Sequence, residues 1–254
     1  QWPPQEQGHS RTQGQGAEAR IRVDATATLD ITQLPALSGL STFADGPAQW
    51  RAVWERPGWI PREREQARRS ALTLSSDLSG TSLRFPLGLR KPAAVASDTQ
   101  ISWEWGTNQP QDVRLNYGDQ LQAHGRWSAD GPGRLGVHFG PDPAVLPAEA
   151  VTQITGTLPV VAMDALDGGQ GAQQLPWVDR LPPLASVNVE LAGIDIARWR
   201  IATTQVSAEV DDSLWQLRLD GAAAGQGQWR PSPQRQLTLD LTRLVVDRRP
   251  DLDA

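Results

Sequence analysis

The side chains that could bind a metal or carry a proton are few and scattered. Histidine and carboxylate groups are the usual candidates in a protein that contains no cysteine. The three histidines are His9, His124 and His138. His9 lies in a polar segment, while His124 and His138 fall on the polar side of two alternating runs. A metal site would need a third ligand that the sequence does not place, so we interpret both as solvent-facing strand residues.

The acidic pairs also give no sign of a metal or catalytic site. Asp211 with Asp212, and Asp247 with Asp251, stand at turns or near the end of the chain, where carboxylates are usually solvated. The sequence has no Gly-x-Ser-x-Gly elbow, no His-Glu-x-x-His helix and no phosphate-cradling glycine loop. We therefore predict that the protein is not an enzyme and uses no metal or cofactor.

Charge and composition argue against a nucleic-acid partner. The 24 basic and 29 acidic residues are spread along 254 residues, so no basic face stands out for phosphate groups. The only methionine is Met163, and neither a signal peptide nor a membrane-spanning apolar run is evident. We expect the chain to be part of a longer protein. Residues 1–19 are rich in Gln and Gly, which predicts a mobile polar leader.

From Arg20 onward, apolar and polar residues alternate, as in a β-strand with one apolar and one wet face. Short turns of Gly, Asp, Asn and Pro separate the runs and favour antiparallel hairpins. The prediction is an all-β protein with an antiparallel meander and few short helices, the candidate helical turns being residues 61–70, 144–150 and 175–181. The alternation recurs around residues 21–31, 72–78, 83–89, 101–105, 113–117, 135–139, 187–191, 215–219 and 237–241.

An internal repeat suggests how the strands are organised. Residues 113–139 align without gaps with residues 215–241, so that Gly125 and Trp127 match Gly227 and Trp229. Between the copies lies a segment rich in Gly, Gln and Pro that loses the alternation. We predict a β-sheet unit over residues 20–165, a junction over 166–183, and a second β unit over 184–254 whose sheet either continues the first or stands alone.

Eleven tryptophans, against one tyrosine and three phenylalanines, are the compositional oddity. On the residues alone, three interpretations stay open: stacking on sugars, lining an apolar cleft, or filling a packed core. Trp50, Trp54 and Trp59 cluster in a stretch that we interpret as irregular. Five others fall on the apolar side of alternating runs, namely Trp103, Trp105, Trp127, Trp215 and Trp229.

Residues 72–93, LTLSSDLSGTSLRFPLGLRKPA, resemble a recurring phrase of the YhdP branch of the AsmA-like proteins of Gram-negative envelopes. Phe85, Leu87 and an extra residue pair before Lys91 depart from the phrase. A segment beginning at Tyr117-Gly-Asp119 and the stretch Trp215–Leu241 also resemble later parts of that family, so the likeness covers residues 20–250. The residues that carry the first phrase are Ser76, Asp77, Leu78, Gly80, Pro86, Gly88, Lys91 and Pro92.

The resemblance implies a periplasmic segment of an inner-membrane-anchored envelope protein that conducts phospholipids between two membranes. Its fold would be a long, strongly curved, taco-like β-sheet with an apolar groove. Its partners would be phospholipid acyl chains, the rest of its own longer chain and the membrane anchor. Gly80 would permit a bend or bulge that makes a corner in that sheet. The residues expected to line the groove are Ile21, Val23, Leu29, Leu72, Leu74, Ile101, Trp103, Leu115, Leu217, Leu237 and Leu239.

Two other interpretations remain open beside this one. The alternation does not say whether the apolar face meets lipid or packs as a closed core, so a structural or interaction scaffold of the envelope is the first alternative. A carbohydrate-binding β-sandwich that uses its tryptophans is the second.

Overall fold

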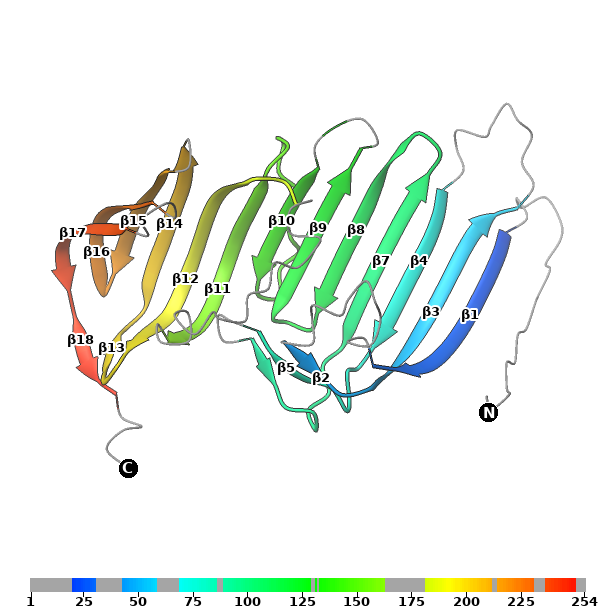
Figure 1. Ribbon diagram of the computed structural model, residues 1–254, viewed down its shortest axis with the longest axis horizontal. Helices are drawn as coiled ribbons and strands as arrows, with labels where there is room; N and C mark the ends of the chain where they lie inside the picture. The colour runs from blue at the N-terminus through cyan, green and yellow to red at the C-terminus, as the bar shows by residue number, and fades with distance from the viewer. Residues whose placement is uncertain are drawn as a thin grey trace.

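The computed structural model describes residues 20–30, 43–58, 69–85, 89–128, 131, 133–162, 181–211, 214–230 and 236–249. These residues form strands and contain no helix, and fifteen of the strands belong to one large open sheet (Figure 1). Along the sheet the strand order is β1 (Arg20–Leu29), β3 (Ala48–Pro57), β4 (Arg69–Ser76), β7 (Thr99–Gly106), β8 (Gln109–Tyr117), β9 (Leu121–Trp127), β10 (Arg134–Phe139), β11 (Thr152–Ala162), β12 (Leu184–Ile196), β14 (Thr204–Asp211), β15 (Leu214–Gly221), β16 (Ala223–Arg230) and β17 (Gln236–Leu244).

Two short strands extend this sheet at its C-terminal end, and three others form a separate sheet. β13 (Trp199–Ile201) pairs with β12 and with β18 (Val246–Arg248). β2 (Ala44–Asp45), β5 (Ser82–Arg84) and β6 (Arg90–Lys91) form the small sheet, which we call the cap. β1 and β17 lie at opposite ends of the large sheet, which does not close into a barrel. The all-β prediction is confirmed.

Two pairings depart from the predicted antiparallel meander. β10 pairs in parallel with β11, and β11 pairs in parallel with β12. Parallel neighbours need a crossover rather than a hairpin, and the segment 140–151 provides one. That segment crosses the polar face of β10 at Gly136, where an added Cβ would overlap the Val145 carbonyl oxygen. Three of its twelve residues are prolines, and the sequence predicted no more here than a helical turn over residues 144–150.

The alternation places a continuous apolar row across the large sheet. Paired residues of neighbouring strands share a face, so the pairing register links side chains from strand to strand. Every member of this row is Ala, Val, Leu, Ile or Gly. The apolar row runs Ala25, Ala52, Leu74, Ile101, Leu115, Ala123, Val137, Ile154, Val187, Ala208, Leu217, Gly227 and Leu239.

A row of polar residues lies beside it on the opposite face, one residue away on every strand. None of its thirteen members is apolar. The polar row runs Thr26, Arg51, Ser75, Gln100, Asn116, Gln122, His138, Thr155, Asn188, Ser207, Arg218, Gln226 and Asp240. The sheet therefore has one apolar and one wet face over its whole width.

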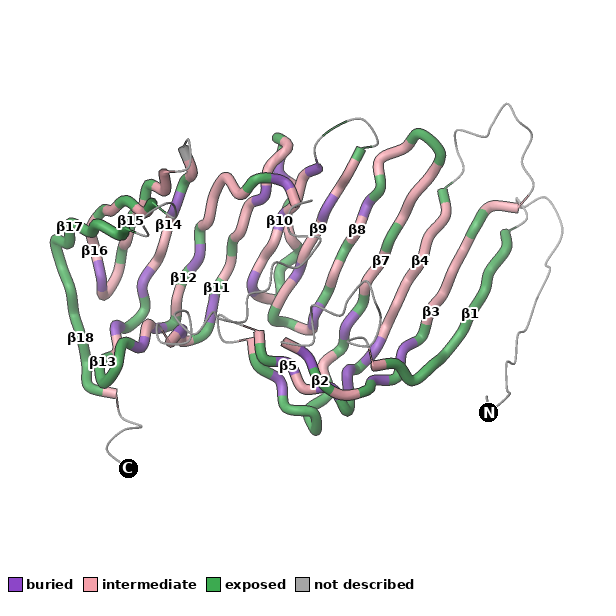
Figure 2. Tube along the Cα trace, in the orientation of Figure 1, coloured by how far each residue is buried: buried purple, intermediate pink, exposed green. Residues whose placement is uncertain are grey.

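Burial is concentrated in the middle of the sheet. One buried cluster joins the cap to the large sheet through Ala44, Leu78, Leu83, Trp50 and Tyr117. A second cluster spans β10, β11 and β12 around Phe139, Leu158 and Val189. By contrast, β1, β17 and β18 are exposed along their whole length (Figure 2).

The phrase that carries the family resemblance builds the cap. The chain leaves the large sheet after Ser76 and turns through Leu78 and Gly80, both with positive φ, 51° and 95°. Gly80 faces the Pro47 carbonyl oxygen so closely that a Cβ would not fit, and its amide donates to the Ala93 carbonyl at 2.9 Å. The expected corner within one sheet is therefore wrong. Gly80 instead allows the chain to turn out of the large sheet and start a second one.

Lys91 holds the cap together from inside. Its side chain is 3% exposed, and its Nζ donates to the carbonyl oxygens of Leu78 and Thr81, each at 2.7 Å, and to that of Pro92 at 3.3 Å. A buried ammonium costs free energy unless such acceptors surround it. Burial lowers the pKa of Lys91, and the nearby Asp77 carboxylate opposes that shift.

The predicted units are joined in one sheet. β11 of the first unit pairs with β12 of the second along ten residue pairs. The leader, residues 1–19, and residues 166–180 of the predicted junction lie outside the described residues. So do residues 61–68 and 175–180 of two candidate helical turns. Residues 69 and 70, predicted as the end of a helical turn, instead begin β4, and residues 144–150 form no helix, so the helical prediction is wrong at both places.

The two copies of the repeat form the meanders β8–β9–β10 and β15–β16–β17. Their pairing differs by two residues, because Val113 pairs with Gly125 whereas Leu217 pairs with Gly227.

Gly136 gives a test of the crossover. Replacing Gly136 with valine should lower the free energy of unfolding by about 1–3 kcal/mol, because the new side chain displaces the Val145 carbonyl. Urea unfolding followed by circular dichroism measures the loss. Gly131→Val is the matched control, since a Cβ there would meet only an ordinary contact with Ser128. Equal stability of the two variants would show that segment 140–151 does not rest on β10.

Candidate functional site

All eleven residues predicted to line a groove lie on the apolar face. Leu74, Ile101, Leu115, Leu217 and Leu239 belong to the apolar row itself. The others lie on neighbouring rows of that face: Val23, Leu72 and Trp103 follow one row through Trp54, Leu237 pairs with Trp229, and Ile21 and Leu29 stand on β1. The structure does not gather them at one point. They spread across β1, β4, β7, β8, β15 and β17.

Toward both ends of the sheet this apolar face is open to solvent. Val23 is 49% exposed on β1, Trp103 is 41% exposed on β7, and Leu237 is 53% exposed on β17. Side chains of this kind on a packed core would be buried. Exposed apolar side chains are common where a protein meets an apolar partner, so this face is the candidate site.

Under the cap, the same face becomes one wall of an apolar cavity of about 370 Å³. The large sheet contributes Trp50, Thr99, Ile101, Leu115, Tyr117, Leu121, Val137 and Phe139. The cap and its flanking loops contribute Ala44, Leu78, Leu83, Phe85 and Leu89. Only Ile101 and Leu115 among these were predicted as lining residues.

A missed strand explains why Trp50 was not predicted as a lining residue. The stretch around Trp50 and Trp54 was interpreted as irregular, but it is the ten-residue strand β3. Its small and large apolar residues, Ala48, Trp50, Ala52 and Trp54, alternate with Gln49, Arg51 and Val53, so a period of two was present. The arginines of this strand, and Val53 as an apolar residue on the wet face, obscured the alternation.

Four of the tryptophans pack against one another in two pairs. Trp103 and Trp105 have ring centroids 5.0 Å apart at an angle of 47°, and Trp215 and Trp229 have theirs 5.6 Å apart at 49°. Such tilted pairs stabilise neighbouring positions of one face. A ring already tilted against its neighbour offers less flat area for a sugar to stack on.

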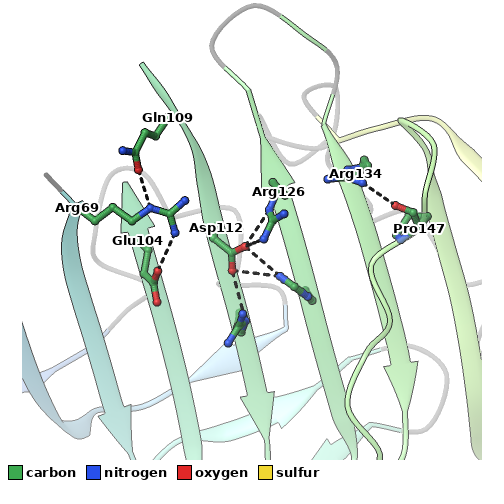
Figure 3. A network of polar contacts seen from close by, with 9 residues as sticks. Arg69, Glu104, Gln109, Asp112, Arg126, Arg134 and Pro147 are labelled. Atoms are coloured by element: carbon green, nitrogen blue, oxygen red, sulfur yellow. Dashed lines mark hydrogen bonds and ion pairs between the residues drawn. The ribbon is translucent and has the colours of Figure 1, made fainter. Parts of the chain in front are cut away.

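The wet face carries a paired charge network centred on Asp112 (Figure 3). Asp112 is 5% exposed; it accepts from Arg126 Nη2 at 2.8 Å, and His124 Nε2 lies 3.1 Å from its Oδ1. Arg114 Nε lies 3.3 Å from the same oxygen. Burial alone would raise the pKa of Asp112, but the hydrogen bonds from Arg126 and His124 outweigh it and hold the pKa below the ordinary 3.8. This carboxylate is occupied in joining β8 to β9.

His138, the other strand histidine, lies 3.0 Å through Nδ1 from the Thr155 hydroxyl on the wet face of β11. Both histidines lie on the face opposite the apolar row, as the alternation predicted. They are not the solvent-facing residues that we expected, because each is partly buried against a polar neighbour. Among the described residues, no group of three His, Asp or Glu side chains is arranged to hold a metal ion.

Comparison with known families decides the relationship. The family model described as "YhdP protein" matches residues 8–253. The chain belongs to the YhdP family. The predicted resemblance is thereby confirmed, and in this YhdP-family chain the phrase that first suggested it forms the cap over the apolar cavity.

No curated protein and no solved structure matches the chain. Within the described residues, no helix has the length and apolar character needed to cross a membrane.

Asp112 gives a pH-dependent test. Because its folded-state pKa is depressed, its contribution to stability is fully present above its unfolded-state pKa and is lost as pH falls through the lower, folded-state value. Asp112→Asn should remove about 1–3 kcal/mol at neutral pH and flatten the loss of stability on acidification. Urea unfolding between pH 2 and 7, about the range over which a carboxylate titrates, measures both. Asp119→Asn, in an exposed turn, is the control. If Asp112→Asn lost stability on acidification as steeply as the parent protein, the assignment would be contradicted.

Proposed function

We propose that this YhdP-family chain shields the acyl chains of phospholipids on its apolar face and conducts them across the sheet without catalysis. The observation that carries the proposal is the unbroken apolar row over thirteen strands, together with the solvent exposure of its flanking side chains. A surface meant only to close a core would not need to run the full width of an open sheet.

The energetics suit this task. Exposing an acyl chain to water costs about 0.8 kcal/mol per methylene, or roughly 12 kcal/mol for a sixteen-carbon chain. An aliphatic face removes much of that cost at every strand, while the polar row keeps the opposite face hydrated. The apolar row contains no charged residue, so no single strand needs to bind the acyl chain tightly. An acyl chain can therefore bind to the face and also leave it.

The two alternatives find less support. A scaffold with a filled core is disfavoured by the exposure of Val23, Trp103 and Leu237. A sugar-binding sandwich would need a second sheet facing the first over its width, whereas the cap in the described part of the chain has three short strands.

The edges of the sheet support a place within a longer assembly. In the described residues, β1 pairs only with β3, and β17 pairs only with β16. Exposed edge strands readily accept another strand. We propose that strands from the rest of the longer chain continue the sheet, and that the whole is the periplasmic part of an envelope protein anchored in the inner membrane.

Photo-crosslinking at Leu217 tests the proposal in cells. A photoreactive residue at Leu217, on the apolar row, should capture phospholipid, whereas one at the adjacent Arg218, on the polar row, should not. Mass spectrometry of the crosslinked protein identifies the lipid. Equal capture at both positions, or none at either, would contradict the proposal. Retention of the protein on a polysaccharide column without capture of phospholipid would contradict it as well.

A matched pair on β17 gives the corresponding variant. Leu239→Glu should reduce co-purifying phospholipid about tenfold. The variant loses the apolar contact of the leucine, worth about 1.5–3 kcal/mol, and places a charge on the apolar face. Thr238→Glu places the same charge on the other face of the same exposed strand and should leave the lipid content unchanged. Lipid content is measured by solvent extraction of the purified protein.

A further inference from the structure

The tryptophans are distributed unevenly over the apolar face. Of the eight tryptophans in the described residues, six lie on one side of the apolar row, toward the strand ends where β3 ends and β4 begins. We call these strand ends, the upper ones in Figure 1, the tryptophan rim. The other two are Trp50, which is buried against the cap, and Trp199 on β13. The six are Trp54, Trp103, Trp105, Trp127, Trp215 and Trp229.

The rings at this rim combine apolar surface with access to solvent. Trp103 is 41% exposed, and the other five are partly exposed. The ring of Trp127 lies over Gly125 and Gly133, where a Cβ would overlap it, so it rests on the apolar face of the sheet. In membranes, tryptophan concentrates at the level where acyl chains meet head groups, because its ring is apolar and its N–H is a donor. A row of such rings is what a bound lipid would need at that same level.

Arg56 places a positive charge on the apolar face at the tryptophan rim. It pairs with Ile21 in the strand register and shares its face with Trp54, two residues before it. Its side chain is exposed, and within the described part of the chain it makes no hydrogen bond or ion pair. A guanidinium group binds phosphate oxygens through two parallel N–H donors. Arg56 is therefore free to bind a phosphate group at the edge of the apolar face.

The charges near the two rims differ in sign. Glu55, beside Arg56, does not neutralise it, because Glu55 lies on the wet face and accepts from Arg22 Nη1 at 2.7 Å. The opposite rim carries three carboxylates around one hollow, namely Asp77, Asp98 and Asp119. A phosphate group is consequently attracted to the tryptophan rim and repelled from the opposite one.

The distance from this rim to the cap suits an acyl chain. Six residues of β3 separate Arg56 from Trp50, which lines the apolar cavity under the cap, so the path along the strand is about 20 Å. One leaflet of a bilayer holds its acyl chains within about 15 Å, half of the hydrocarbon thickness. An acyl chain that lies along β3, with its head group at Arg56, therefore reaches the cap with its methyl end.

We propose that phospholipids bind with their phosphate groups at the tryptophan rim, where Arg56 contacts them, and with their acyl chains along the strands toward the cap. This inference rests on the proposed function for its ligand class. It adds an orientation, in which head groups follow one rim only. A lipid that moves from strand to strand would then carry its phosphate past the tryptophans and its methyl ends beneath the cap.

Two photoreactive phospholipids test the orientation. Phosphatidylethanolamine with a diazirine on its head group should label the tryptophan rim at Ser70 and Trp105, which pair with each other. The same lipid with the diazirine at the end of an acyl chain should label the cap at Leu83 and Phe85. Mass spectrometry of peptides from the labelled full chain locates the products. The reverse pattern, identical labelling by both lipids, or no labelling overturns the orientation, even if Leu217 captures phospholipid in cells. Absence of capture at Leu217 overturns the proposed function itself.

Arg56→Gln tests the phosphate contact. The variant should bind phosphatidylglycerol with a fluorescent acyl chain about threefold more weakly than the parent, as for one exposed charge pair. It should bind a fluorescent diacylglycerol, which has no phosphate, equally well. Arg20→Gln is the matched control, because Arg20 pairs with Pro57 at the same rim but on the wet face. Equal phosphatidylglycerol binding by the two variants, or equal weakening of both lipids in Arg56→Gln, overturns the contact. An effect on the binding of inorganic phosphate alone would assign Arg56 to free phosphate and overturn it too.

Discussion

Everything in this molecule depends on the register of the strands across the large sheet. Side chains alternate with a period of two, so a slip of one residue in any pair of strands would turn an apolar side chain to the wet face. Twelve successive pairings carry the apolar row from Ala25 to Leu239 without such a slip. Irregularities do occur, at Glu104, Thr152 and Ala224, yet the row passes all three of them. The two faces therefore stay separate over the full width of the sheet.

The large sheet has one buried cluster within β10, β11 and β12, and the cap adds a second. The chain interrupts the sequence of strands between β4 and β7, turns at Leu78 and Gly80, and returns over the apolar face. An ammonium group inside the cap takes the place that an apolar side chain would usually fill. Its three carbonyl acceptors all lie within the cap and its turn, so Lys91 stabilises the cap as a unit while the wall toward the large sheet stays apolar.

Much of this fold could be predicted from the sequence because the period of two is visible in single runs such as Ile21–Leu29 and Val113–Tyr117. The faces of all eleven predicted residues follow from that pattern alone. Three strands, β3, β11 and β14, were not among the predicted runs. The rest of what was missed is long-range: which strand pairs with which, and what folds over the face. Nothing near residue 140 distinguishes a crossover from a hairpin, and nothing in the phrase around Gly80 says that it leaves its sheet. The burial of Trp50 and Tyr117 against the cap likewise depends on long-range contacts, since each is an ordinary strand aromatic in the sequence.

The position of the crossover connects the topology with the proposed function. Changing from antiparallel to parallel pairing at β10 and β11 leaves paired residues on a common face, so the apolar row is not broken there. The crossing segment must nevertheless lie over one face, and Gly136 shows that it lies over the wet one. Arg134 donates to the Pro147 carbonyl from the same side, which holds the segment in place. Had residues 140–151 passed over the apolar face, they would have filled it between Val137 and Ile154. Placing the crossing on the wet face keeps the apolar path free at the point where the topology changes.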